Sequence, residues 1–335
     1  MIKAVFVQQD KKRELINRVY AGDSIGRIGK YASIYPELMK KEDMQAHGEY
    51  LRDVEAIFST WGMAALSEEE IGQYFPRLKA VFYAAGSVQD FARPFLNKGI
   101  AVVSAWAANA VPVAEYTLAQ ILLANKGFFQ NALKAKKDYA LARKFSETFS
   151  GNYSVKVGIL GAGMIGTKVI ELLKPFNIKV LAYDPFLSEE RAEKLGVEKC
   201  TAAEIFSQCQ TISNHIANLP ATQGILNGEL FDKMLPNATF INTGRGAQVV
   251  EEALIKALKS VPTRTAVLDV TMPEPPGPDS ELRKMENVIL TSHIAGSMNF
   301  EVQRMGCYMA EEFENYINGK GLKYGVTLQM LETMA

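Results

Sequence analysis

A glycine-rich segment near the middle of the chain constrains the fold more than any other feature. An apolar run, Val155–Leu160, leads into the sequence GAGMIG at residues 161–166. A helical pattern follows, and then a second apolar run that ends at Asp184. A strand, a glycine turn, a helix and another strand in this order form a βαβ unit, in which the two strands are parallel. The segment therefore predicts an α/β fold with a parallel sheet.

The three glycines of this segment have the spacing GxGxxG, and each has a separate role. Gly161 allows the tight turn out of the strand, Gly163 leaves room for a pyrophosphate beside the backbone, and Gly166 lets helix and strand pack closely. The N–H groups that begin the helix, at Met164 and Ile165, favour the same anion. The alternative is a glycine-rich turn that binds no dinucleotide.

Asp184 follows Gly166 by 18 residues and ends the second strand of the unit. A carboxylate at this place accepts hydrogen bonds from the adenosine ribose hydroxyls of a dinucleotide. The same negative charge repels a 2′-phosphate. The sequence therefore predicts NAD rather than NADP as the cofactor.

Composition narrows the class of protein. The chain has 335 residues, 48% of them hydrophobic, which is enough for two cores. Lys+Arg and Asp+Glu are 37 each, and this balance gives no reason to expect nucleic acid or an anionic membrane as a partner. Three scattered cysteines indicate reduced thiols, and we expect no metal site. With no signal-peptide pattern or membrane-span-length apolar run, we expect a cytoplasmic protein.

Apolar strand-like runs alternate with helical patterns through most of the chain, which favours two parallel-sheet domains. A capping box at Ser67–Glu70 begins one helix. A polar, basic stretch, residues 134–153, is interpreted as a solvated connection or a subunit contact. The expected strands are 2–7, 56–60, 78–84, 100–104, 155–160, 180–183, 211–215, 239–242, 265–270, 288–291 and 323–327, and the clearest other helices are 113–128 and 300–317.

Downstream of the glycine segment, polar residues follow the ends of apolar strands, which is where open α/β sheets bind ligands. Arg245 lies between two glycines and could hold a carboxylate with two parallel hydrogen bonds. Glu274 lies in a proline-rich loop after the strand that ends near Asp269. His293 follows the next strand. Each has an ordinary structural explanation when taken alone, but together they form a chemical set beside a nucleotide motif.

These motifs resemble those of the D-isomer-specific 2-hydroxyacid dehydrogenase family. The similarity covers nearly the whole chain and includes AAGSVQD, ANAVPVAEYTLA, VGILGAGMIG, INTGRGAQVVEEAL, LDVTMPEP and ILTSHIAG. It implies two Rossmann-like or flavodoxin-like domains. An NAD-binding domain at 106–299 would be inserted into a discontinuous substrate domain at 1–105 and 300–335. It also implies a homodimer that pairs through the NAD-binding domain.

The resemblance implies a catalytic role for three residues. Arg245 would bind the carboxylate and carbonyl oxygen of the substrate and lie beside the cofactor. His293 would donate a proton as hydride moves between NADH and the carbonyl carbon. Glu274 would pair with the other imidazole nitrogen, fix the tautomer and favour the charged ring.

It also implies binding roles for other positions. Asp269 would hold the nicotinamide carboxamide, and His215 would lie near the cofactor phosphates. Thr117, Thr243 and Gly296 would line the nicotinamide pocket, and the backbone amides of Ala85, Gly86 and Ser87 would bind the substrate carboxylate.

The chain departs from the family pattern at a few places: Ala217-Asn218-Leu219 follows His215, Val88 replaces a common glycine, Ser292 precedes His293, and Trp106 is unusual. Trp106 either narrows the substrate pocket or only packs. The sequence favours an NAD-dependent reductase of small 2-oxo acids such as glyoxylate or hydroxypyruvate. The alternatives are a short phosphoglycerate dehydrogenase and an NAD-sensing corepressor-like protein of the same fold, which would bind NADH without turnover.

Overall fold

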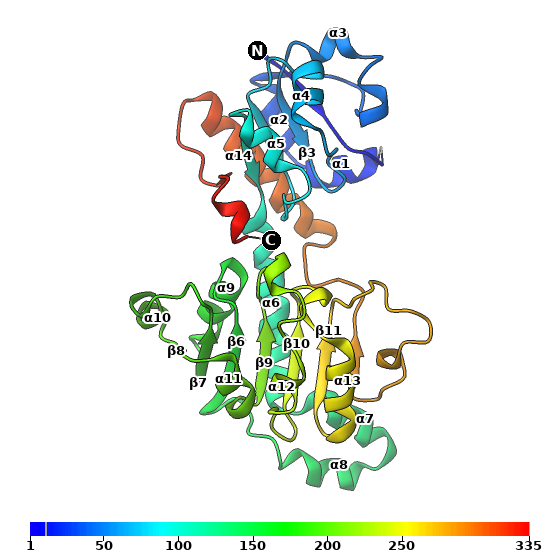
Figure 1. The fold of residues 1–335 in the computed structure, drawn as a ribbon, viewed down its shortest axis with the longest axis vertical. Helices are drawn as coiled ribbons and strands as arrows, with labels where there is room; N and C mark the ends of the chain where they lie inside the picture. Colours follow the sequence, from blue (N-terminus) through cyan, green and yellow to red (C-terminus); the bar gives the residue numbers. More distant parts are fainter. Residues whose placement is uncertain (11, 335) are drawn as a thin grey trace. The chain divides into compact units, whose positions relative to one another are not determined.

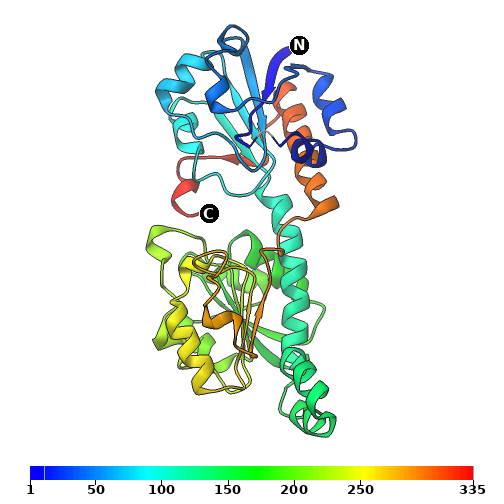
Figure 2. The same cartoon turned by 90° about the vertical axis from the view of Figure 1, so that its right-hand side faces the viewer.

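The computed structural model describes residues 1–10 and 12–334, and the chain divides into two compact units (Figures 1 and 2). Unit 1 comprises residues 1–109 and those from 297 onward, and unit 2 comprises residues 110–296. Each unit is an α/β domain with its own sheet. The α/β fold class with two parallel-sheet domains is therefore confirmed.

Unit 1 contains a six-stranded sheet in the order β13-β5-β4-β3-β1-β2. All neighbours are parallel except β13, which is antiparallel to β5. The strands of this sheet are β1 (Ile2–Phe6), β2 (Ala32–Ile34), β3 (Val54–Ser59), β4 (Ala80–Tyr83), β5 (Ala101–Ser104) and β13 (Gly325–Val326).

Helices cover both faces of this sheet. Helix α14, which lies within the expected helix at 300–317, packs Met305, Met309 and Phe313 into one apolar cluster. The opposite cluster includes residues of α4 and α5, and α4 begins with the expected capping box of Ser67 and Glu70. The helices of unit 1 are α1 (Arg13–Val19), α2 (Ser24–Gly29), α3 (Gly48–Leu51), α4 (Glu68–Tyr74), α5 (Ala92–Asn97) and α14 (Val302–Ile317).

Unit 2 contains a seven-stranded sheet in the order β12-β11-β10-β9-β6-β7-β8, and all its neighbours are parallel. A parallel sheet with helices on both faces buries its strands, which explains their nearly continuous apolar sequences. Its strands are β6 (Val155–Leu160), β7 (Ile178–Tyr183), β8 (Glu198–Lys199), β9 (Thr211–Asn214), β10 (Thr239–Asn242), β11 (Thr265–Leu268) and β12 (Val288–Leu290).

The two faces of the unit 2 sheet carry separate cores. One cluster joins Ile121 of α6 and Val169 of α9 to the sheet, and the other joins Phe206 of α11, Phe231 of α12 and Leu254 of α13. The helices of unit 2 are α6 (Trp106–Asn125), whose first four residues belong to unit 1, α7 (Phe128–Lys137), α8 (Tyr139–Ser146), α9 (Met164–Leu173), α10 (Glu189–Leu195), α11 (Ala202–Gln208), α12 (Gly228–Phe231) and α13 (Glu251–Ser260).

One helix begins earlier than expected, and one polar stretch contains helices. Helix α6 begins at Trp106 rather than near residue 113 and contains Pro112, a residue that removes one helical hydrogen bond and usually marks a helix start. Residues 134–153 were expected to connect or to contact a subunit, and much of that stretch is helical in α7 and α8. Within the described part of the chain, no helix has both the length and the apolar character needed to cross a bilayer.

Candidate active site

The carboxyl ends of six neighbouring strands in unit 2 lie level with one another. Tyr183, Leu160, Asn214, Asn242, Leu268 and Leu290 are paired in register across β7, β6, β9, β10, β11 and β12. The residues that directly follow the first five of these positions are Asp184, Gly161, His215, Thr243 and Asp269. All five are predicted cofactor-binding residues, so the sheet brings them to one edge.

The glycine turn has the local geometry that its proposed roles require. Gly161 has φ of 89°, which is the left-handed region, and a Cβ there would lie 2.6 Å from the carbonyl oxygen of His215. A Cβ on Gly166 would lie 1.9 Å from the carbonyl oxygen of Gly161. A Cβ on Gly163 would meet no described protein atom within 4 Å. Gly161 and Gly166 therefore shape the turn, whereas Gly163, just before Met164 and Ile165 of α9, leaves open space.

Asp184 is partly buried and fixed at the same turn. Its Oδ2 accepts a hydrogen bond from the Ala162 amide at 2.8 Å, and its Oδ1 accepts one from the Phe186 amide at 2.8 Å. Each carboxylate oxygen has a second lone pair, so both can still accept a hydrogen bond from a ribose hydroxyl. These two amide contacts hold the carboxylate at the turn.

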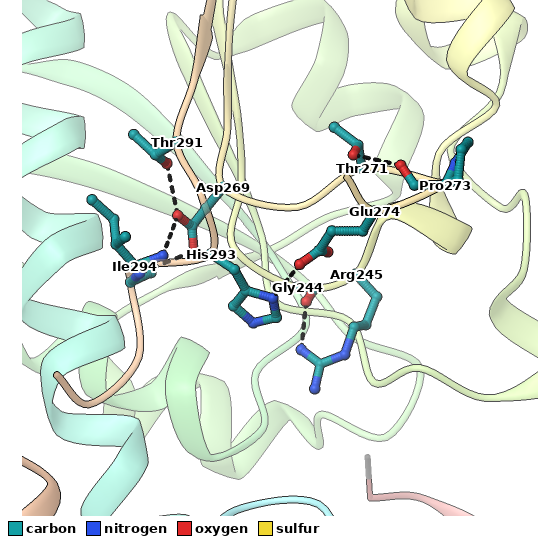
Figure 3. A network of polar contacts seen from close by, with 10 residues as sticks. Gly244, Arg245, Asp269, Thr271, Pro273, Glu274, Thr291, His293 and Ile294 are labelled. Carbon is teal, nitrogen blue, oxygen red and sulfur yellow. Dashed lines mark hydrogen bonds and ion pairs between the residues drawn. The ribbon is translucent and has the colours of Figure 1, made fainter. Parts of the chain in front are cut away.

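His293 and Glu274 form a direct pair (Figure 3). The Nδ1 of His293 lies 2.6 Å from the Oε1 of Glu274. With the proton of Nδ1 directed at the carboxylate, Nε2 is the nitrogen left for a ligand. The Glu274 loop lies after β11 and is braced by a hydrogen bond of 2.8 Å from the Thr271 hydroxyl to the Pro273 carbonyl.

The backbone of His293 has an unusual conformation, with φ of 59°. Residues other than glycine rarely adopt this left-handed backbone region, and those that do are often found at functional sites. The His293 amide donates to the carbonyl oxygen of Asp269 at 3.1 Å. Neighbouring contacts therefore hold the His293 backbone in a conformation that a histidine would rarely adopt by itself.

Asp269 fixes the loop that carries His293 (Figure 3). Its buried carboxylate accepts hydrogen bonds from the Thr291 hydroxyl at 2.7 Å, the Ile294 amide at 2.8 Å and the Ala295 amide at 3.0 Å. Gly296 ends this segment at the boundary of unit 2. The family resemblance implies that Asp269 is a cofactor ligand, and the structure adds that it positions the histidine loop.

Arg245 is directed toward the region of His293 and Glu274 in Figure 3. Its Nη1 donates to the carbonyl oxygen of Gly244 at 2.8 Å, and its side chain is partly exposed. A Cβ on the following Gly246 would lie 2.0 Å from the Thr271 carbonyl carbon, so glycine is required where the two loops approach each other. Since Nη1 makes the one side-chain hydrogen bond of Arg245 to a described residue, the guanidinium has further donors for an anion.

A buried amide network supports the Arg245 loop, and sequence reasoning missed it. Asn214 donates to the side-chain oxygens of Asn242 at 3.0 Å and Gln248 at 2.6 Å. Asn242 donates to the Arg245 carbonyl at 3.1 Å, and the Arg245 amide donates to Gln248 at 3.2 Å. All three amide side chains are fully buried. Their only sequence signal is polar residues at or near the ends of apolar strands.

Thr243 connects two other predicted cofactor residues. Its hydroxyl lies 3.4 Å from that of Thr117 and 3.5 Å from Nδ1 of His215. The other ring nitrogen of His215 lies 2.9 Å from the Ser213 hydroxyl. Burial lowers the pKa of His215 to about 3, so its imidazole is neutral at pH 7. The predicted binding role therefore relies on hydrogen bonding rather than on positive charge.

The predicted substrate loop follows β4 in unit 1. The Ser104 hydroxyl donates to the carbonyl oxygens of Ala85 at 2.9 Å and Gly86 at 2.6 Å. Among the described residues, no hydrogen bond is donated by the amide of Gly86 or Ser87. These two N–H groups are available to bind an anion. Val88 is fully buried in the core of unit 1, so its departure from the common glycine contributes to packing.

Trp106 and the segment after His215 show how the other departures are accommodated. Trp106 packs against the ring of Tyr324 with a centroid distance of 6.3 Å, which agrees with a packing role. After His215, the Thr222 hydroxyl donates to the Ala217 carbonyl at 2.7 Å and accepts from the Leu219 amide at 2.9 Å. The altered segment thus forms a turn closed by its own hydrogen bonds.

Comparisons with known proteins identify the family of the chain. A family model described as D-isomer specific 2-hydroxyacid dehydrogenase, NAD binding domain, matches residues 118–295. The chain belongs to this family. The matched range contains the glycine turn, Asp184, Arg245, Glu274 and His293.

Relatives of this family member include D-3-phosphoglycerate dehydrogenases. That of Synechocystis is 34% identical over 263 residues, which cover 78% of this chain and 47% of the relative. That of Archaeoglobus fulgidus is 33% identical over 236 residues, which cover 70% of this chain and 44% of the relative. The chain thus spans about half the length of the curated relatives that it matches.

Two solved structures have the same fold as this chain over nearly its whole length. D-mandelate dehydrogenase from Rhodotorula graminis aligns with a TM-score of 0.79 at 20% identity, covering 97% of this chain and 98% of that one. A phosphoglycerate oxidoreductase from Rhizobium etli aligns with a TM-score of 0.79 at 21% identity, covering 97% of each chain. At these identities the similarity concerns the fold.

The lowered pKa of His215 makes the stability of this family member dependent on pH. The unfolded chain, with a histidine pKa of 6.5, binds more protons than the folded one between pH 6.5 and about 3. The contribution of neutral His215 to the free energy of unfolding is therefore complete above pH 6.5 and is lost on acidification, by up to about 1.4 kcal/mol per pH unit.

We expect denaturant unfolding between pH 7 and pH 5 to show a smaller loss of stability in His215→Gln than in the wild type. His47→Gln is the matched control, and equal slopes in wild type and His215→Gln would contradict the prediction.

Proposed function

We propose that the chain is an NAD-dependent D-2-hydroxyacid dehydrogenase that interconverts small 2-oxo acids and D-2-hydroxy acids. The observation that carries this proposal is the contact of 2.6 Å between His293 Nδ1 and Glu274 Oε1, at the sheet edge that also carries the glycine turn. Glyoxylate and hydroxypyruvate are the proposed substrate type. A fixed imidazole and a guanidinium match a carbonyl oxygen and a carboxylate, the two groups that every 2-oxo acid presents.

The proposed proton transfer uses Nε2 of His293. In the reductive direction this nitrogen gives its proton to the substrate carbonyl oxygen and becomes neutral. Bound NADH supplies the hydride that the carbonyl carbon accepts. The carboxylate of Glu274, whose Oε1 lies 2.6 Å from Nδ1, keeps the other proton on that nitrogen and so leaves Nε2 for the substrate. In the oxidative direction, neutral Nε2 takes the hydroxyl proton back.

Substrate orientation is assigned to Arg245 and to backbone donors. Arg245 can bind a carboxylate through its free N–H groups, and the amide network of Asn214, Asn242 and Gln248 holds its loop. Within unit 1, the amides of Gly86 and Ser87, which donate no hydrogen bond among the described residues, are also suited to a carboxylate, with Ala85 beside them. For the cofactor, Gly161, Gly163 and Gly166 would receive the pyrophosphate, and Asp184 would bind the adenosine ribose.

A panel of 2-oxo acids assayed for NADH oxidation tests the proposed function. Turnover of glyoxylate or hydroxypyruvate, with formation of the D-isomer from a substrate that yields a chiral product, would support it. Turnover of 3-phosphohydroxypyruvate alone would favour the phosphoglycerate dehydrogenase alternative. NADH binding without turnover of any 2-oxo acid would contradict an enzyme and favour an NAD sensor.

We also propose that the chain forms a homodimer through unit 2. Helices α7 and α8 expose Phe128, Tyr139 and Leu141, with Tyr139 77% exposed. Apolar side chains of this size, exposed together on neighbouring helices, are commonly covered by a partner chain.

Sedimentation equilibrium tests the dimer. It should give an average mass of about twice the chain mass of 37.0 kDa, and Leu141→Asp should lower this average mass. A wild-type protein that remains a monomer at micromolar concentration would contradict the dimer.

A further inference from the structure

Arg191, in the first turn of α10, makes contacts that the proposed mechanism does not use. Its Nη2 donates to the Ala162 carbonyl oxygen at 2.7 Å and to the Thr167 hydroxyl at 2.9 Å. Ala162 lies between Gly161 and Gly163 of the dinucleotide turn, and Thr167 lies in α9. A side chain from α10 is therefore fixed to the turn at which a dinucleotide would bind.

The rest of this guanidinium is available to a ligand. The side chain is exposed, and no hydrogen bond or ion pair among residues 1–10 and 12–334 uses Nη1 or Nε of Arg191. Two of the three acids of α10 are paired with lysines, Glu190 with Lys194 at 2.6 Å and Glu189 with Lys199 at 3.1 Å, and the third, Glu193, makes no ion pair with Arg191 in the described part of the chain. A planar cation with free N–H groups and no carboxylate partner is well suited to bind a phosphate.

The backbone of Ala162 also contacts an acidic side chain, that of Asp184. The Ala162 amide donates to Asp184 at 2.8 Å, and its carbonyl accepts from Arg191 at 2.7 Å. The adenosine ribose would lie at Asp184, so a phosphate on its 2′-oxygen would meet opposite charges from these two side chains. Asp184 repels such a group, and Arg191 attracts it.

We infer that Arg191 is a ligand for the 2′-phosphate of NADPH, and that Asp184 masks its effect in the wild-type chain. The inference rests on the proposed dinucleotide site. It means that the chain discriminates between NADH and NADPH through two opposed side chains. Removal of the acid alone is therefore sufficient to make the site accept NADPH, because the cation that the phosphate needs is already in place.

A double-mutant cycle tests the inference through equilibrium binding. Dissociation constants for NADH and NADPH are measured by fluorescence titration of the wild type, Asp184→Ser, Arg191→Met and the double variant. We expect Asp184→Ser to increase NADPH affinity by roughly 10- to 100-fold, the range for a charge-assisted hydrogen bond. The double variant should bind NADPH roughly 10-fold or more weakly than Asp184→Ser, because the phosphate has lost its cation, while these two variants should bind NADH alike.

Lys194→Met is the matched control, since it removes one positive charge from the same helix but not from the turn. Combined with Asp184→Ser, it should retain the increase in NADPH affinity. Arg191→Met that weakens NADH and NADPH by the same factor in both backgrounds would overturn the inference, because Arg191 would then only support the turn. Thermal melting of each variant identifies misfolding, and Arg191→Lys provides a milder substitution in that case. A wild-type chain that binds neither dinucleotide would instead contradict the proposed function.

Discussion

His293→Ala is expected to lower kcat by about 10²–10⁴, the range typical of lost general acid–base catalysis. The affinity for NADH should stay nearly unchanged, because the substitution leaves the glycine turn and Asp184 intact. The physical reason is the loss of Nε2, the atom proposed to exchange a proton with the substrate oxygen, while Arg245 still binds the carboxylate. Steady-state kinetics with the best 2-oxo acid, together with a fluorescence titration of NADH, gives both quantities.

His47→Ala is the matched control for this experiment. His47 is a histidine of unit 1 whose Nδ1 lies 2.9 Å from the Tyr35 hydroxyl, and it has no proposed part in the chemistry. Its variant should retain the wild-type kcat. If His293→Ala retained more than half of the wild-type kcat, the role assigned to this imidazole would be wrong.

Gly166→Val should weaken NADH binding by on the order of 10²-fold, which corresponds to about 2.7 kcal/mol. A side chain at this position would lie 1.9 Å from the Gly161 carbonyl oxygen, so α9 cannot approach the strand and the turn must open. Because the contact is with backbone atoms, no side-chain rotation relieves it. The melting temperature should fall as well, since overpacking a close contact destabilises the fold.

Gly163→Val separates folding from binding at the same turn. No described protein atom lies within 4 Å of the added Cβ, so the melting temperature should stay near that of the wild type. NADH affinity should still fall, because the added side chain occupies space assigned to the pyrophosphate. Gly26→Val in α2, where an added Cβ also meets no described protein atom, controls for the substitution itself. Unchanged NADH affinity in Gly163→Val would show that the cofactor does not bind beside this glycine.

The sequence was sufficient to predict the α/β class and most strands of both sheets. Parallel strands are buried on both faces, so their apolar runs are distinct, and β6, β9 and β10 lie at or within one residue of the expected positions. The candidate site could be predicted as a set because its members follow strand ends. Once those strands pair in register, the side chains after them must share one edge.

The remaining features depend on contacts between distant parts of the chain. Asn214 and Gln248 are 34 positions apart in the sequence, so no local pattern marks them as partners. In the folded unit, however, Nδ2 of Asn214 lies 2.6 Å from Oε1 of Gln248. The left-handed backbone of His293 is enforced by contacts with Asp269, and a histidine by itself does not favour it. Arg191 looks like an ordinary helical surface residue until the fold places it against Ala162.

The level ends of the six strands limit how this architecture can tolerate insertions and deletions. Successive residues of a strand point to opposite faces, so adding or removing one residue within β10 or β11 would reverse the direction of every side chain beyond that point. The loops after the strands are under no such restriction. Changes in length should therefore accumulate in the loops, and substrate preference can diverge there while the spacing that aligns the reactive groups is preserved.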